Sequence, residues 1–282
     1  MFGGLFGKRL STAWEYSVDG VLWRLLPGAD GLLVGEDRDL EKKSVSFFCL
    51  DAATGAVRWK NVQFPEQWWI SMELIHNNVL ILHEYAAPDM PDHKKLYGVD
   101  LATGAVLWLN EEAKLLFAHG DHLYTARDTF EERIFTEIRL LDGTVVRTVG
   151  AEEIREVQRS LPDAPAGAVE FPSVALPGEL RDPLVGPALA VLTKDGAERA
   201  LTEYIATDGY VVAAVCTASA PLEQDRTFQQ RITVFDRTRN RIVFADEMNA
   251  RLSMPVPDMF FRKGPFAYYI KEKSTLCAVH LK

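Results

Sequence analysis

The sequence has few cysteines, no long apolar run and no excess of basic residues. Its three cysteines are unclustered and lie among apolar residues, so a disulfide framework or cysteine zinc site is excluded and buried thiols are expected. No window approaches the roughly 18 apolar residues of a membrane span. The first ten residues, MFGGLFGKRL, lack the basic start and unbroken apolar stretch of a secretion signal. We therefore predict a cytoplasmic protein without a membrane span.

The charge balance is acidic. The 282 residues include 40 acidic and 31 basic side chains, which gives a formal net charge of −9 at pH 7. Binding to nucleic acid depends on Lys and Arg to neutralise phosphates, so no nucleic-acid partner is expected. The sequence also lacks a Gly-x-Ser-x-Gly motif, a phosphate-binding glycine loop and a dinucleotide fingerprint. These absences remove several common enzyme classes.

A ten-residue segment occurs twice with little change. LDAATGAVRW ends at Trp59, and VDLATGAVLW ends at Trp108. Aspartate accepts hydrogen bonds from backbone N–H groups of the following turn, and glycine supplies its positive φ. Each copy therefore predicts a tight hairpin whose second strand carries a tryptophan. Weaker copies keep part of the pattern at Asp142-Gly143 and at Asp236, Asn240 and Phe244.

A second, apolar type of hairpin also recurs along the chain. Its turns centre on Asp30-Gly31, Asn77-Asn78, Gly120-Asp121, Asp208-Gly209 and Gly264-Pro265. An apolar hairpin followed by an aspartate hairpin makes a four-stranded unit, as in a propeller blade. The last unit lacks its fourth strand, and residues 11–16 (STAWEY) look like the strand that carries Trp59. We therefore predict an all-β fold: a single-domain β-propeller over residues 1–282, with five four-stranded blades closed by the N-terminal strand.

The repeat is similar to that of a known superfamily. The D-x-x-T-G-x-x-x-W units of Asp51–Trp59 and Asp100–Trp108 resemble the repeats of the pyrroloquinoline-quinone-type β-propeller superfamily. The resemblance implies structural roles for the aspartate, glycine and tryptophan, with the tryptophan docking blades together. Quinone enzymes of that superfamily have an adjacent cysteine pair and a secretion signal, and this sequence has neither. We expect no quinone and no other cofactor; many members of the superfamily bind proteins.

Residues 151–198 interrupt the repeat. Their first part has apolar residues at helical spacing, at Ile154, Val157 and Leu161, and a proline-rich stretch follows. Proline is poorly suited to central strands. We predict an insertion that contains one helix, a proline-rich excursion and an added strand at Ala188–Thr193. A degenerate sixth blade is the alternative, because the interval is close to two repeat lengths.

The strand connections supply candidate binding residues. Propeller ligand sites usually lie at the central channel or on the face built by the second-to-third and fourth-to-first connections. Acidic residues outnumber basic ones in these connections, which predicts an acidic loop face that attracts a basic protein surface or a cation. A solvated rim of mixed charge is the alternative. The candidate partner- or ligand-binding residues are Trp68, Trp69, Asp89 and Asp92.

Three carboxylates are the candidate catalytic residues. Glu73, Glu203 and Asp258 each lie shortly before an apolar turn, which places them on innermost strands that face the channel. Glycosidic cleavage needs an acid and a second carboxylate about 5–10 Å apart. Position alone supports this role, and hydrated channels tolerate carboxylates without catalysis.

The histidines do not indicate a metal site. His119 and His122 share a tight turn, and His83 and His93 form a loose set with Asp89 and Asp92. Neither group has the ligand spacing of a zinc site, so surface histidines and no metal are expected. We predict a non-enzymatic scaffold that presents an acidic loop face to a protein partner or a small ligand. The alternative is a carbohydrate-active hydrolase that uses the channel carboxylates.

Overall fold

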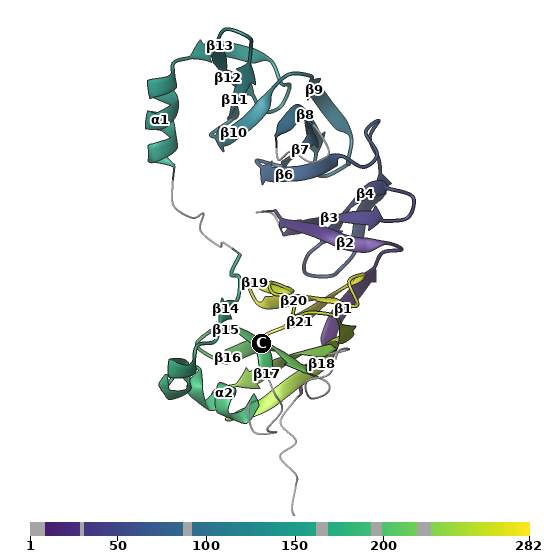
Figure 1. The fold of residues 1–282 in the computed structure, drawn as a ribbon, viewed down its shortest axis with the longest axis vertical. Coiled ribbons are helices and arrows are strands. Elements are labelled where there is room, and N and C mark those ends of the chain that lie inside the picture. The colour runs from purple at the N-terminus through teal and green to yellow at the C-terminus, as the bar shows by residue number, and fades with distance from the viewer. Residues whose placement is uncertain (1–8, 29–30, 87–91, 162–168, 193–198, 219–226) are drawn as a thin grey trace, which may run out of the picture. The chain divides into compact units, whose positions relative to one another are not determined.

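The computed structural model describes residues 9–28, 31–86, 92–161, 169–192, 199–218 and 227–282, which form mainly antiparallel sheets (Figure 1). The chain divides into two compact units. One comprises residues 19–166, and the other comprises residues 1–18 and 167–282. We call them the 19–166 unit and the 167–282 unit.

The 19–166 unit contains three four-stranded sheets, in the orders β2-β3-β4-β5, β6-β7-β8-β9 and β10-β11-β12-β13. Each strand is antiparallel to the next one in sequence, so every sheet is a meander. Helix α1 follows the last strand. The elements are β2 (Val21–Pro27), β3 (Leu32–Asp39), β4 (Ser44–Asp51), β5 (Val57–Val62), β6 (Ile70–His76), β7 (Val79–Tyr85), β8 (His93–Asp100), β9 (Val106–Asn110), β10 (Lys114–His119), β11 (His122–Asp128), β12 (Arg133–Arg139), β13 (Val145–Val149) and α1 (Ala151–Ser160).

The 167–282 unit contains two sheets, in the orders β14-β15-β16-β17-β18 and β1-β21-β20-β19. Two short helical segments precede β15. The elements are β1 (Thr12–Ser17), β14 (Ser173–Val174), the 3-10 helix η1 (Pro177–Arg181), α2 (Gly186–Leu192), β15 (Arg199–Ala206), β16 (Tyr210–Ala218), β17 (Phe228–Asp236), β18 (Arg241–Leu252), β19 (Phe260–Lys263), β20 (Phe266–Lys271) and β21 (Thr275–His280).

The N-terminal strand completes the last sheet. β1 pairs antiparallel with β21, with Trp14 opposite Ala278 and Tyr16 opposite Leu276 (Figure 1). The backbone groups on this side of β21 are thereby bonded instead of forming an open edge. The predicted all-β fold is confirmed, with five sheets among the described residues. Four contain a four-stranded meander, and the last is a three-stranded meander completed by β1.

Tryptophan joins successive repeats in the 19–166 unit. Trp59 Nε1 donates a hydrogen bond of 2.8 Å to the carbonyl oxygen of Leu101, in the turn that follows β8. The same turn contains Gly104, whose φ is +75° and where a Cβ would lie 3.0 Å from the Trp59 ring. Glycine therefore serves both the turn and the docking of the indole. Trp108 repeats the arrangement on Leu140 and Gly143.

The repeated aspartate closes its turn as the sequence predicts. The N–H and hydroxyl of Thr54 donate to Asp51 Oδ1 at 3.0 and 2.7 Å, and the hydroxyl bond lowers the pKa of Asp51. Thr103 and Asp100 make the same pair of bonds. All three cysteines are buried and unpaired, as predicted.

The segment from 151 to 198 partly differs from the prediction. The helix is confirmed as α1, whose Ile154 packs with Phe117 and Tyr124. The strand predicted at Ala188–Thr193 is wrong, because residues 186–192 form α2. Apolar side chains at 185, 188, 189 and 192 have helical spacing, and they pack against β16 and β17. The added strand is β14, which pairs with β15, and no sixth sheet occurs among the described residues.

Candidate functional site

Four aromatic side chains lie close together on the 19–166 unit. We call this group, Trp23, Trp68, Trp69 and Tyr85, the aromatic patch. Trp23 on β2 is 61% exposed, and Trp69 in the β5–β6 connection is 37% exposed. The ring of Trp69 meets those of Trp68 and Tyr85 edge-on, at centroid distances of 6.4 and 6.3 Å. The predicted pair Trp68-Trp69 is therefore in a loop with at least one indole open to solvent.

A buried ion pair between Arg38 and Glu36 packs against the aromatic patch. The Arg38 guanidinium lies 5.6 Å from the Trp23 ring and 5.2 Å from the Trp68 ring. It donates to Glu36 Oε2 at 3.0 Å and to the carbonyl oxygens of Trp68 and Ile70 at 2.9 and 2.6 Å. Both side chains of the pair are almost fully buried. Arg38 therefore holds the backbone of Trp68 in the β5–β6 connection and packs against Trp23 of β2.

The second carboxylate oxygen of Glu36 completes this network. It accepts hydrogen bonds from the Ser71 hydroxyl at 2.5 Å and from the Met72 N–H at 2.9 Å. Since Glu36 is on β3 and its two donors are on β6, the carboxylate ties neighbouring sheets together. A buried charge that is fully hydrogen-bonded and paired avoids most of its desolvation cost.

Glu66 shapes the loop that presents the tryptophans. Its Oε1 accepts the backbone N–H groups of Trp68 and Trp69 at 2.9 and 2.8 Å. Burial raises the pKa of Glu66, but these two hydrogen bonds and the nearby lysines together lower it by more, so the pKa is lowered overall. The carboxylate thus stays ionised at neutral pH and holds a tight turn.

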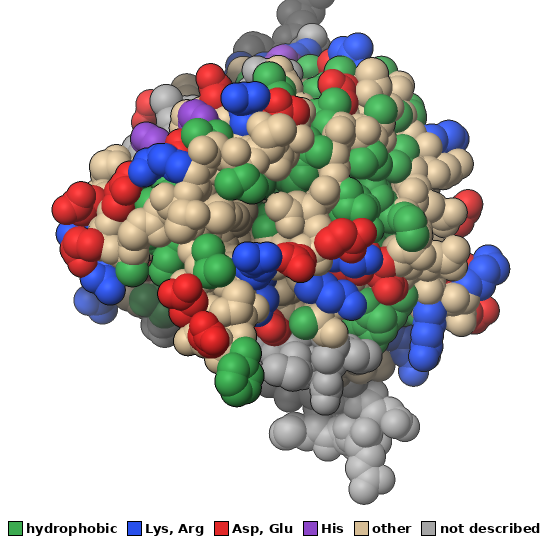
Figure 2. Space-filling view, turned by 90° about the horizontal axis from the view of Figure 1, so that it is seen from above, with side chains coloured by type: hydrophobic (Ala, Val, Ile, Leu, Met, Phe, Trp, Pro, Cys, Tyr) green, Lys and Arg blue, Asp and Glu red, His purple; other side chains and the backbone are tan. Residues whose placement is uncertain are grey.

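Ion pairs offset part of the acidic charge of the loop face among the described residues. Lys114 lies 2.8 Å from both Asp92 and Asp128, and its pKa is raised by these two hydrogen bonds. Arg127 and Glu112 form a similar pair at 2.5 Å. Figure 2 shows acidic and basic side chains interspersed over another view of the molecule, seen from above the view of Figure 1. Asp92 is therefore neutralised by Lys114, and Asp89 lies outside the described residues.

Beside the aromatic patch, the structure brings together Glu73, His83 and His93. Glu73 on β6 is the extra residue of a β-bulge, because Met72 pairs with Leu82 and Leu74 with Ile81. A bulge redirects a side chain, as sites near the ends of strands often require. Glu73 Oε2 lies 2.5 Å from His83 Nδ1 and 3.4 Å from His93 Nδ1. We call these three residues the Glu-His-His cluster.

The two imidazoles of the Glu-His-His cluster are stacked. Their ring centroids are 3.5 Å apart and their planes differ by 10°. Tyr85 of the aromatic patch meets both rings edge-on, at 4.9 and 5.5 Å. His83 is 1% exposed, so the sequence interpretation of it as a surface histidine is wrong.

The pKa values of Glu73 and His93 are both lowered from their usual values. Burial raises the pKa of Glu73, but the contact with His83 and the charges of the imidazoles lower it by more. The pKa of His93 is lowered, chiefly by burial and then by His83, despite the opposing effect of Glu73. An ionised carboxylate beside a neutral imidazole is therefore favoured at neutral pH.

The sequence contained a signal for this cluster. Glu73, His83 and His93 are equally spaced along the chain, and the predicted meander places them on three consecutive strands. The bulge that turns Glu73 toward the imidazoles has no clear sequence mark, since MEL at 72–74 reads as ordinary alternation. Grouping the histidines with the nearer Asp89 and Asp92 therefore missed the actual carboxylate.

The other two candidate carboxylates lie together in the 167–282 unit. Glu203 is 1% exposed, and its Oε1 accepts the N–H of Asp258 at 3.1 Å. Its other oxygen is buried and has no hydrogen-bond partner among the described residues. Burial raises the pKa of Glu203. Asp258 is exposed and has a φ of +57°. Glu203 therefore lies beneath the surface with an unsatisfied acceptor.

We expect Glu203→Gln to stabilise the protein at neutral pH. A raised native pKa contributes stability that is present at low pH and is lost as pH rises through that pKa. Glutamine mimics the neutral acid, so the variant should exceed wild type by about 1 kcal/mol at pH 7 and match it at pH 4. Urea unfolding at both pH values measures this difference. The exposed Glu131→Gln is the control, and an equal effect of Glu203→Gln at both pH values would contradict the explanation.

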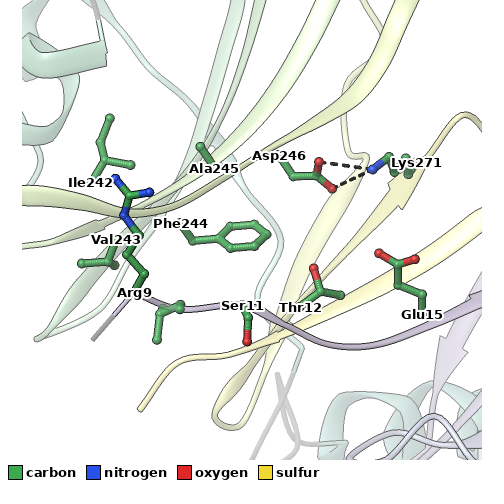
Figure 3. A pocket seen from close by; sticks show the side chains of 11 residues that line it. Arg9, Ser11, Thr12, Glu15, Ile242, Val243, Phe244, Ala245, Asp246 and Lys271 are labelled. Carbon is green, nitrogen blue, oxygen red and sulfur yellow. Dashed lines mark hydrogen bonds and ion pairs between the residues drawn. The ribbon is translucent and has the colours of Figure 1, made fainter. Parts of the chain in front are cut away.

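A cavity of about 570 Å³ lies in the 167–282 unit beside β1 and β18 (Figure 3). Arg9 and Phe244 line it, together with an ion pair between Lys271 and Asp246 at 3.1 Å. Burial raises the pKa of Asp246, but hydrogen bonds from Tyr269 and Lys271 lower it by more, so the pKa is lowered overall. The volume suits a small molecule. The cavity lies between the outermost strands of two sheets, and no sequence motif pointed to it.

The meander sheets, their tryptophan-joined repeats and the completing N-terminal strand define an all-β protein made of propeller-type blades. A profile described as "Domain of unknown function (DUF4905)" matches residues 28–108. No curated protein matches the chain. No helix in the described part of the chain has the length and apolar character needed to cross a membrane.

Solved structures overlap with the chain at low similarity. A eukaryotic initiation factor is 12% identical, with a TM-score of 0.34. The match covers 94% of this chain and 53% of that protein's chain. The chain thus spans about half of that protein. The Dos1 propeller is 11% identical with a TM-score of 0.31, covering 92% and 68%. Hydrazine synthase of Kuenenia stuttgartiensis is 12% identical with a TM-score of 0.27, covering 87% and 64%. None of these matches is specific to quinone proteins.

Proposed function

We propose that the protein is a non-enzymatic binding scaffold whose aromatic patch contacts a protein partner. The observation that carries this proposal is the pair of solvent-exposed indoles, Trp23 and Trp69. The buried Arg38 lies against Trp23 and against Trp68, the neighbour of Trp69. Tryptophan, tyrosine and arginine are the residues that most often dominate binding energy at protein interfaces. Isolated exposed apolar residues are common, but several aromatic side chains gathered at one surface are a typical mark of an interaction surface.

Part of the patch is also held in place before binding. Arg38, itself bonded to Glu36, and Glu66 make hydrogen bonds to the backbone of Trp68 and Trp69, so little backbone freedom is lost there on association. The ion pairs of Lys114 and Arg127 lie in nearby strand ends and connections and supply the polar surroundings that such interfaces usually have. The negative charge that remains favours a partner with a basic surface.

A hydrolase with channel carboxylates has less support. Glu203 is buried and bonded to a backbone N–H, while Glu73 is engaged by two imidazoles. A glycosidase needs one accessible carboxylic acid and a second carboxylate beside the substrate. The described contacts of these residues favour other roles.

We expect Trp23→Ala/Trp69→Ala to lose partner binding without unfolding. Tagged wild type and variant are used to capture proteins from the native cell extract, and the captured protein is then purified and titrated. Loss of one interface hot spot of 2 kcal/mol weakens affinity about 30-fold, and two should weaken it at least that much. Phe171→Ala, at an exposed aromatic of the 167–282 unit, is the matched control. Equal capture by all three proteins would contradict the proposal.

A further inference from the structure

We propose that Glu73, His83 and His93 form a binding site for a divalent transition metal, and specifically for Zn²⁺. One carboxylate oxygen and two imidazole nitrogens are a donor set that zinc uses in proteins with one position left open. Each of the three residues offers one ligand atom, and these atoms all lie within 4.8 Å of one another. The site is independent of the aromatic patch's proposed partner.

The distances are close to those that a metal requires. Tetrahedral zinc with bonds of about 2.0–2.2 Å holds its ligand atoms about 3.3–3.5 Å apart. Glu73 Oε2 and His93 Nδ1 are already 3.4 Å apart. Glu73 Oε2 and His83 Nδ1, at 2.5 Å, need to separate by about 1 Å. One imidazole must also rotate out of the stack, because the in-plane lone pairs of two parallel rings cannot both point at one ion. Glu73 is in a bulge and His93 is the first residue of β8, so both can move by that amount without disturbing a regular ladder.

The burial of His83 is a second and independent observation. Its side chain is 2% exposed, and neither ring nitrogen makes a hydrogen bond among the described residues. The contact of Nδ1 with Glu73 is close, but it does not have hydrogen-bond alignment. Buried polar atoms in native proteins nearly always have partners. A metal at Nδ1 supplies a partner for this nitrogen and draws the carboxylate and the second imidazole into one shell.

The surrounding charges permit a cation. Asp92, the residue before His93, forms an ion pair with Lys114. Glu73 is therefore the principal negative charge of the site. Arg24 is the nearby positive charge, and its guanidinium is directed to the carbonyl oxygen of Met72 at 2.5 Å. One carboxylate with two imidazoles favours zinc over calcium or magnesium, which prefer sets made of oxygen ligands.

Metal titration of the full chain tests the site. Protein treated with a chelator and dialysed is titrated with ZnCl₂ in a calorimeter, and with CoCl₂ while the visible absorption is recorded. We expect one Zn²⁺ per chain, a higher Tm with zinc, and the Co²⁺ spectrum of nitrogen and oxygen ligands. Glu73→Gln and His93→Gln should each weaken binding at least about 100-fold, since even changes outside the ligand shell cost 10–100-fold.

His119→Gln is the matched control, because His119 is an exposed histidine of the same unit. It should bind zinc as wild type does. Absence of saturable zinc binding, or unchanged affinity in both Glu73→Gln and His93→Gln, would overturn the proposal. Both variants change partly exposed side chains, and circular dichroism verifies their folding. The titration needs no partner protein, so its failure is distinguishable from failure of the binding role of the aromatic patch.

Discussion

Replacing Trp59 by alanine is expected to lower the free energy of unfolding by about 3–5 kcal/mol. The Trp59 ring is 8% exposed, and its indole N–H donates to the Leu101 carbonyl oxygen of the neighbouring sheet. The substitution removes that bond and leaves a cavity against Gly104, which has no side chain to fill it. Urea denaturation followed by circular dichroism measures the loss.

The exposed Trp69→Ala is the matched control for Trp59→Ala. Trp69 lies in a loop and is 37% exposed, so its removal should change stability by about 0.5 kcal/mol or less. Similar losses for the two variants would show that the Trp59 indole does not join the sheets. Trp108→Ala should behave like Trp59→Ala, because Trp108 makes the same bond to Leu140.

Arg38→Met is the second substitution with a large expected effect. It removes the ion-pair partner of the Glu36 carboxylate, which is 0% exposed. Removing one partner of a buried pair usually costs about 3–5 kcal/mol, because the remaining charge has lost both water and its counter-ion. The same change frees Trp23 and Trp68 from the guanidinium between them. Urea denaturation measures the cost.

A double-mutant cycle separates the ion pair from simple loss of packing. Glu36→Gln/Arg38→Met removes both charges while keeping similar volumes, so it should regain a large part of the stability that Arg38→Met loses. Additive losses in the double variant would mean that the two side chains do not interact. Partner binding should weaken in Arg38→Met as well, since the indoles are no longer held.

The repeat made the architecture readable from the sequence. An aspartate that accepts bonds from its own turn and a glycine at positive φ have few alternative structures, so Asp51 and Gly104 located their hairpins correctly. Even the degenerate copy is consistent, because Asn240 has a φ of +49° where the other copies have glycine. The single-domain propeller ring over residues 1–282 stays a prediction of the repeat.

The candidate site was harder to predict because it depends on register. A bulge at Glu73 and another irregularity between His83 and Glu84 decide which side chains meet. One extra residue moves the side chains that follow it to the opposite face of the sheet. Nothing in the sequence marks where that residue occurs. The charge count of the strand connections also omitted Lys114, because Lys114 is a strand residue. Its ion pairs with the loop carboxylates therefore could not be counted.

Hydrogen exchange of the protein, alone and with its captured partner, tests the central claim most directly. If the aromatic patch is the binding surface, the backbone amides of residues 66–70 and 83–85 should exchange more slowly in the complex, while those of residues 171–174 remain unchanged. Protection that omits the patch and appears in the 167–282 unit would contradict the account.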